Sequence, residues 1–265
     1  MQLNKKPTNP TSLLNFSIKN LDWRMKKLLI VLILFFSYDA YSQTAEEYYK
    51  RGNAKSDLKD YYGAISDYTK AIELKPDYAS AYVNRGNRKM GLRDYYGAIS
   101  DFIKAIELKP DYPVTYYNSG ISKYFLKDYY GAISDFNKAI ELKPDFEEAY
   151  DNRGVAKYFL KDYYGAISDY NKVIELKSDY PETYYKRGEA KKELKDYYGA
   201  ISDFNKAIEL KPDYALAYFK RAVTKGYLNI NSEACKDFGK AKELSVVIDN
   251  VDMTSLSELI SKFCN

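Results

Sequence analysis

A block of 34 residues recurs along this chain and constrains its fold more than any other feature of the sequence. Five consecutive copies span residues 45–78, 79–112, 113–146, 147–180 and 181–214, and a degraded sixth copy spans 215–244. The segment Leu-Lys-Asp-Tyr-Tyr-Gly-Ala-Ile-Ser-Asp that begins at Leu58 returns almost letter for letter in the next four copies. A period of roughly 20 to 50 residues is typical of arrays in which one unit stacks on the next. We therefore expect residues 43–244 to form one elongated array.

Each copy has the hydrophobic periodicity of two helices. In the first copy Asp60 stands where an N-cap belongs, and the helix that follows must end before Pro76. A preceding helix of about 14 residues is marked by Tyr48, Gly52 and Leu58. Six apolar residues of the second helix share one helical stripe: Tyr61, Ala64, Ile65, Tyr68, Ala71 and Ile72. The pattern predicts an all-α fold of helix pairs.

Repetition is a folding requirement for such a chain. A pair of short helices cannot bury both of its faces alone, so neighbouring pairs must share a continuous core. Each of the first five copies has a glycine in the first helix and an alanine in the second, and we expect these small residues to face each other where the helices approach. The glycines are Gly52, Gly86, Gly120, Gly154 and Gly188, and the alanines are Ala64, Ala98, Ala132, Ala166 and Ala200.

These residues resemble the signature of the tetratricopeptide-repeat (TPR) family, which has aromatic residues, Gly, Ala and Pro at set positions of its repeat. The first copy supplies Tyr48, Gly52, Ala64, Tyr68, Ala71 and Pro76 at those places. The resemblance extends from residue 45 to about residue 244. It implies a right-handed α-solenoid, a superhelix of stacked antiparallel helix pairs, with a concave groove lined by the first helix of each pair.

Two departures from that signature are charged. Arginine stands at a position where leucine is typical in every copy except the third, which has Ser119, and a lysine follows four residues later. Every copy also has an aspartate on its second helix: Asp67, Asp101, Asp135, Asp169, Asp203 and Asp237. We expect structural ion pairs between the two helices, because an arginine or lysine stem can pack on apolar neighbours while its head reaches a carboxylate. The alternative is a charged ladder that binds a ligand.

The composition excludes several classes of function. The chain has no histidine, which removes the commonest general base and the commonest zinc ligand. No pairing of nucleophile and base, metal-ligand cluster or glycine-rich phosphate loop stands out. After residue 42, basic and acidic side chains are equal in number, so the sequence has no electrostatic footprint for nucleic acid. We expect no enzymatic activity, no cofactor, no metal and no nucleic-acid partner.

The amino-terminal segment has the form of an export signal. Residues 25–42 combine a basic start at Lys26 and Lys27, an apolar run from Leu28 to Phe36 and a small-residue exit. Cleavage is expected between Ser42 and Gln43, which would leave no stable membrane span, since the run is too short to cross a bilayer. Residues 1–24 are polar and are expected to be an unstructured leader, or a product of a start assigned upstream of Met25. The predicted location is periplasmic or secreted. An uncleaved anchor or a buried helix is the alternative.

The carboxyl-terminal segment is expected to close the array. Residues 245–265 contain Ser255 and Glu258 in a capping-box pattern, followed by an apolar-periodic stretch. A solenoid requires such a terminal helix to cover its last repeat. The only cysteines are Cys235, on the last repeat helix, and Cys264, beside the carboxyl terminus. An even pair in an exported protein favours a disulfide, and two reduced thiols are the alternative.

The candidate binding site follows from the resemblance, because TPR ligands lie in the groove formed by the first helices. The repeats differ most at these positions, with aromatic residues in the middle copies and polar ones at the ends. The predicted groove residues are Tyr117, Asn118, Ile121, Tyr124, Phe125, Asp151, Asn152, Val155, Tyr158, Phe159, Tyr185 and Lys186. An aromatic centre with a polar margin suits a protein or peptide partner. The alternatives are a carbohydrate-binding module that uses the same rings, or rings that only pack on the neighbouring repeat.

Overall fold

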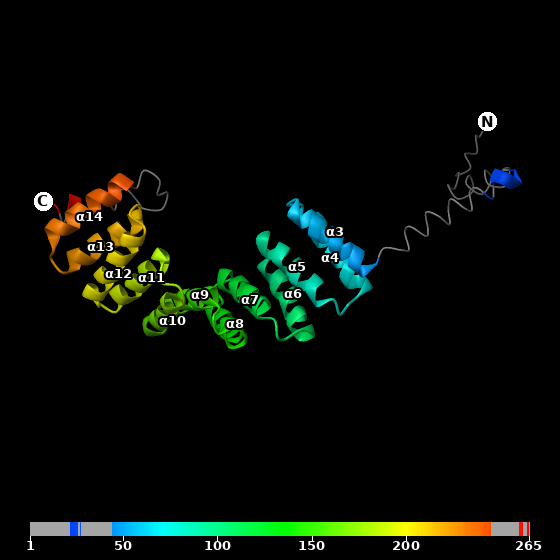
Figure 1. The fold of residues 1–265 in the computed structure, drawn as a ribbon, viewed down its shortest axis with the longest axis horizontal. Coiled ribbons are helices and arrows are strands. Elements are labelled where there is room, and N and C mark those ends of the chain that lie inside the picture. Colours follow the sequence, from blue (N-terminus) through cyan, green and yellow to red (C-terminus); the bar gives the residue numbers. More distant parts are fainter. Residues whose placement is uncertain (1–21, 26, 28–43, 245–259, 262–263, 265) are drawn as a thin grey trace, which may run out of the picture.

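The computed structural model describes residues 22–25, 27, 44–244, 260–261 and 264, and residues 44–244 form a row of paired helices (Figure 1). The predicted all-α solenoid is confirmed. The first helices of the six repeats are α3 (Ala45–Asp57), α5 (Ala79–Gly91), α7 (Pro113–Phe125), α9 (Glu147–Phe159), α11 (Pro181–Glu193) and α13 (Ala215–Tyr227). The second helices are α4 (Tyr61–Leu74), α6 (Tyr95–Leu108), α8 (Tyr129–Leu142), α10 (Tyr163–Leu176), α12 (Tyr197–Leu210) and α14 (Asn231–Leu244).

The helices pack in strict sequence order (Figure 1). Each contacts its partner within the repeat, and the second helix of one repeat contacts the first helix of the next. The first helices of consecutive repeats from α5 onward also contact one another. Because first helices approach each other in this way, they line the inner side of the curved row.

Local chemistry fixes where the helices begin. The predicted N-cap is confirmed, because the Asp60 carboxylate accepts a hydrogen bond of 3.0 Å from the Gly63 amide, and the four following repeats do the same. One residue before this cap, the turn between paired helices has a left-handed conformation with φ near 60° in every repeat. The residues concerned are Lys59, Arg93, Lys127, Lys161, Lys195 and Asn229.

The core of each repeat is an aromatic ring packed among alanines. Tyr68, Phe102, Phe136, Tyr170, Phe204 and Phe238 are at most 1% exposed. The predicted pairing of glycine with alanine is wrong in its partner, because the nearest atoms to each glycine belong to this ring. A Cβ atom on Gly120 would lie 2.7 Å from Phe136 Cε1, and the other four glycines are equally close to their rings. The ring is the largest side chain between the helices, so it leaves little room for a side chain at the glycine position.

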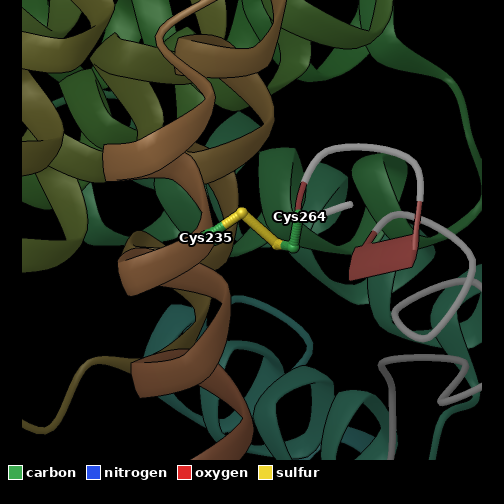
Figure 2. The surroundings of a disulfide bond; sticks show 2 residues. All are labelled: Cys235 and Cys264. Atoms are coloured by element: carbon green, nitrogen blue, oxygen red, sulfur yellow. A yellow bond between two sulfur atoms is a disulfide. The ribbon is translucent and has the colours of Figure 1, made fainter.

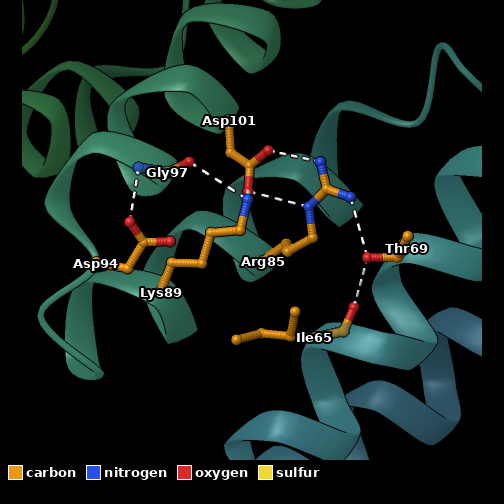
Figure 3. Close-up of polar contacts among 7 residues, drawn as sticks. All are labelled: Ile65, Thr69, Arg85, Lys89, Asp94, Gly97 and Asp101. Carbon is orange, nitrogen blue, oxygen red and sulfur yellow. Dashed lines mark hydrogen bonds and ion pairs between the residues drawn. The ribbon is translucent and has the colours of Figure 1, made fainter.

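The predicted ion pairs between paired helices are confirmed. In the second repeat the Arg85 guanidinium donates to both carboxylate oxygens of Asp101, at 2.6 and 3.0 Å, and Lys89 Nζ lies 2.8 Å from the same carboxylate (Figure 3). Arg85 also donates to Thr69 Oγ1 of the preceding repeat at 3.1 Å. The arginine therefore joins the two helices of its own repeat to the repeat before it.

The predicted terminal segments lie largely outside the described residues, and so does the proposed cleavage site at Ser42 and Gln43. Of the expected unstructured leader, residues 22–24 are described, and residues 23 and 24 are helical. Of the expected capping helix, Ile260, Ser261 and Cys264 are described and helical, and Ile260 packs against Ala222, Ala234 and Phe238. Within the described ranges, the helices are all too short or too polar to cross a bilayer.

Candidate functional site: the groove face of the first helices

Four hollows lie between the first helices of neighbouring repeats, and we call the surface that carries them the groove face. Its residues come mainly from α3, α5, α7, α9 and α11. A hollow of about 490 Å³ between α5 and α7 is lined by Asn87, Met90, Gly91, Arg93, Tyr95, Ile121 and Phe125. Two of the predicted site residues, Ile121 and Phe125, therefore line one depression together with residues of the preceding repeat.

Aromatic rings form a continuous edge beside this hollow. Phe125 stacks on Tyr95 with ring centroids 5.0 Å apart, and Phe159 stacks on Tyr129 at 5.3 Å. Tyr124 links the two stacks, because its ring lies 5.6 Å from Phe125 and 5.9 Å from Phe159. We call this set of seven rings the aromatic edge: Tyr95, Tyr124, Phe125, Tyr129, Tyr158, Phe159 and Tyr163.

The aromatic edge is packed on one side and open on the other. Phe125 is 55% exposed and Phe159 is 51% exposed, although each is stacked on a tyrosine. Tyr124 and Tyr158 are partly buried, and burial raises the pKa of both phenols. The rings thus pack on the neighbouring repeat, as one sequence-based alternative expected, and they also present apolar area to solvent.

A second hollow, of about 230 Å³, lies between α9 and α11 and has an acidic lining. Glu147, Glu148, Asp151 and Glu182 surround it, with Lys186 as the one basic lining residue. Lys186 Nζ donates to Asp151 Oδ2 at 2.5 Å, while Asp151 Oδ1 is buried and accepts no hydrogen bond from the described part of the chain. Burial, reinforced by the charges of Glu148 and Asp151, raises the pKa of the nearby Tyr117 to about 12. The electrostatic environment here favours a positive group.

Three of the predicted polar residues connect neighbouring repeats. Asn118 donates to Asn87 Oδ1 at 2.8 Å, Asn152 donates to Tyr117 Oη at 3.1 Å, and Lys186 pairs with Asp151. Each belongs to the same position of its repeat and reaches back to the first helix before it. Hydrogen bonds of this kind position the helices of the groove face, and Asn152 and Lys186 also line the acidic hollow.

The three remaining predicted residues, Tyr117, Val155 and Tyr185, are partly buried. Tyr117 packs against Phe136 and Phe146 at 5.9 and 4.9 Å between ring centroids, and Tyr185 packs likewise against Phe204 and Tyr214. Burial raises the pKa of the Tyr185 phenol. These two tyrosines support the floor of the groove face, and Val155 is half-buried on the same helix as Asp151.

Sequence reasoning missed several residues that line the two hollows. Met90, Arg93 and Tyr95 line the larger hollow, and Glu148 and Glu182 line the acidic one. The signal was available, because a residue of one repeat and its counterpart 34 positions later flank the same boundary. The site is therefore built from pairs of repeats, whereas the sequence prediction treated each first helix separately.

The two cysteines lie at the carboxyl-terminal end of the array, far along the row from the hollows. A disulfide joins Cys235 of α14 to Cys264, with Cα atoms 5.5 Å apart (Figure 2). The bond attaches the last described helical residue to the last repeat. Within the described ranges, no group of three potential metal ligands is close enough together to hold an ion.

Comparisons with known proteins match this geometry. Models of the tetratricopeptide repeat match residues 45–78, 79–112, 114–146 and 181–214, and a TPR-repeat model matches 156–195, so that together they cover more than half of the chain. No catalytic family is among these matches. A comparison with curated proteins found no match.

Solved structures with the same fold include MamA, which is 24% identical over 64% of this chain and 93% of its own, with a TM-score of 0.62. YrrB, described as a TPR protein with an unusual peptide-binding site, is 23% identical over 72% of this chain and 96% of its own, with a TM-score of 0.61. The pilF protein of Pseudomonas aeruginosa is 16% identical over 82% of this chain and 97% of its own, with a TM-score of 0.66. At these identities the likeness establishes the fold.

Proposed function

Because the chain belongs to the tetratricopeptide-repeat family, we propose that it is a non-enzymatic interaction scaffold that binds a polypeptide segment of a partner along the groove face. The observation that carries the proposal is the aromatic edge, whose central rings Phe125 and Phe159 are held rigidly by stacking and yet remain about half exposed. Rigid aromatic side chains supply binding area at low cost in conformational entropy. YrrB, which has the same fold, is described as having a peptide-binding site.

The two hollows define what the segment should contain. An apolar side chain fits beside Met90, Ile121 and Phe125 in the larger hollow. A basic side chain fits the hollow of Glu148, Asp151 and Glu182, where acidic residues outnumber the one basic lining residue, Lys186. We therefore expect a segment with an apolar or aromatic residue and, further along, a lysine or arginine.

Binding to a peptide library tests this proposal. Replacement of Phe125 and Phe159 by alanine should weaken the best peptide by at least about tenfold, since truncation of a central aromatic anchor costs about 2 kcal/mol. The matched control replaces Tyr130 and Tyr164, which are 77% and 76% exposed and take no part in the aromatic edge. Equal losses in both variants, or no selected peptide at all, would contradict the proposal. Selective binding to a glycan array would instead favour the carbohydrate alternative.

We also propose that the chain is exported and oxidised. The basic, apolar and small-residue pattern of residues 25–42 supports this, as does a disulfide geometry available to Cys235 and Cys264. Amino-terminal sequencing of the protein isolated from its native cells should begin at Gln43. A protein that retains the stretch after Met25, or two titratable thiols in the isolated protein, would contradict export.

A further inference from the structure

One arginine is missing from an otherwise regular set, and the residues that this arginine contacts in the other repeats are retained on its own repeat. In five repeats a guanidinium group lies over a tyrosine ring, at 4.7–5.5 Å from the centroid, and donates two hydrogen bonds to the aspartate of the second helix. Figure 3 shows the two hydrogen bonds between Arg85 and Asp101. In the third repeat the arginine is replaced by Ser119, while the tyrosine (Tyr116), the aspartate (Asp135) and the lysine (Lys123) are retained.

The retained carboxylate is more open than its counterparts. The Asp135 side chain is 14% exposed, whereas the other five aspartates are 3–7% exposed. Among the described residues its one ion-pair partner is Lys123, whose Nζ lies 2.7 Å from Oδ2, although this buried oxygen accepts no hydrogen bond of good geometry from the described part of the chain. In the other repeats the aspartate contacts both an arginine and a lysine. The third repeat therefore keeps one cation of the pair and lacks the other.

The preceding repeat has changed at the same place. The third guanidinium nitrogen reaches back to Thr69, Asn137, Asn171 or Asn205 at 2.6–3.1 Å. The corresponding residue before the third repeat is Ile103, which makes no such bond and is 49% exposed. The boundary between α6 and α7 thus lost the arginine and its acceptor together. Ile103 occupies the position from which Thr69 contacts Arg85, so it would contact the methylene stem of an arginine bound in the same way.

We propose that Tyr116, Asp135 and the rim residue Ile103 form a binding site for an arginine side chain of a partner polypeptide. The ligand would stack its planar guanidinium on Tyr116 and pair with Asp135, as the chain's own arginines do in the other repeats. Arginine is preferred over lysine because the fork of two N–H groups matches a carboxylate and the plane matches an aromatic face.

The surface of the fourth repeat that corresponds to this site is lined by Tyr150, Arg153 and Asp169 and shares no residue with the groove-face hollows. The two sites can therefore be tested separately.

A selective NMR label isolates the site. Asparagine carbonyl carbon and serine nitrogen labels together give signals only for Asn-Ser pairs, which are Asn118–Ser119 and Asn231–Ser232. Titration of the full chain with N-acetyl-arginine amide should shift the Ser119 signal with half-saturation in the millimolar range and leave Ser232 unchanged. N-acetyl-citrulline amide, which is nearly the same shape but uncharged, should shift neither signal.

Two variants complete the test. Asp135→Asn retains Ser119 and should lose the shift, because the ionised acceptor is gone. Ser119→Arg supplies the guanidinium from the chain itself, so the dose-dependent rise in melting temperature that N-acetyl-arginine amide gives the natural protein should be absent. The proposal is overturned if Ser119 does not move, if citrulline and arginine act alike, or if Asp135→Asn keeps the shift.

Discussion

At the scale of single residues, the contact between glycine and aromatic ring sets how closely paired helices approach. The sixth repeat shows what an added methyl group does, because Ala222 replaces glycine there. Its neighbouring rings, Phe219 and Phe238, are inclined at 62°, whereas the equivalent pairs of the first, third and fifth repeats are inclined at 46–48°. A ring can therefore turn to admit one carbon, but a branched side chain needs more room than a rotation provides.

We predict that Gly154→Val destabilises the protein by about 1 to 3 kcal/mol, because the new side chain overlaps the Tyr170 ring. Gly239→Ala is the matched control, since nothing lies within 4 Å of its added Cβ and the helix gains about 1 kcal/mol from the better propensity of alanine. Chemical unfolding of the two variants measures both changes. Equal stability of Gly154→Val and the natural protein would show that the ring does not limit the approach.

The ion pair of the first repeat predicts a dependence of stability on pH. The hydrogen bond from Arg51 holds the pKa of Asp67 below its usual value near 3.8. A carboxylate with a lowered pKa in the folded state stabilises the fold above its unfolded pKa and loses that contribution as the pH falls through the folded value. The free energy of unfolding should therefore decrease below about pH 4, and Asp67→Asn should decrease less steeply. Parallel pH profiles for the two proteins would contradict this origin.

At the scale of helices and turns, the sequence predicted most of what the structure contains. The helical periodicity of apolar residues, the Asp60 cap and Pro76 located α4 and the equivalent helices of the other repeats. These signals depend on local chemistry alone. The fourth repeat keeps its second helix ending at Leu176 although Ser178 replaces the proline. The left-handed turn residue was not predictable, since lysine or arginine stands in five of the six places and glycine in none.

That turn allows a stabilising change. Lys127 has φ of 63° and its backbone amide donates to the Tyr124 carbonyl, an arrangement that glycine can adopt without a Cβ clash. We predict that Lys127→Gly raises the free energy of unfolding by up to about 1 kcal/mol. Lys104→Gly, the same substitution inside α6, should lower it by about 1 kcal/mol. Thermal unfolding of both variants decides whether the turn is strained, and a loss of stability at position 127 would show that it is not.

For the candidate site, the sequence predicted the residue types but not their roles. Tyr117, Asn118 and Asn152 are expected to face a ligand, and the sequence did not indicate that they also contact Phe136, Asn87 and the Tyr117 hydroxyl. A helical wheel gives the direction of a side chain and does not give the distance to the next repeat. That distance decides whether a long polar side chain meets solvent or the neighbouring helix.

At the scale of the whole molecule, the boundary between the second and third repeats differs from the other four. It keeps the link from Asn118 to Asn87 on the groove face but has no counterpart to the arginine that joins α4 to α5. In a solenoid, stability is approximately a sum of repeat and boundary contributions, so one altered boundary changes the array locally. This boundary should exchange its amide hydrogens faster than the rest.

We predict that Ile103→Asn combined with Ser119→Arg stabilises the array by about 1 kcal/mol. The free energy gained from the new charge-assisted hydrogen bonds exceeds the free-energy cost of fixing the arginine side chain in one rotamer. The reciprocal change at the next boundary, Asn137→Ile with Arg153→Ser, should destabilise it by about 1 to 3 kcal/mol. Hydrogen exchange followed by mass spectrometry should locate both effects at the altered boundaries. A uniform change along the chain, or destabilisation by the first pair of substitutions, would contradict the prediction.

The helices α8 and α12 have the same fourteen residues, although they lie two units apart in the array. Genes that encode such duplicates recombine, and an exchange between these two segments would delete or add two units while every helix start and end stayed in frame. Descendants of this chain can therefore differ in the length of the surface that they offer to a partner, while each unit folds and packs as it does now.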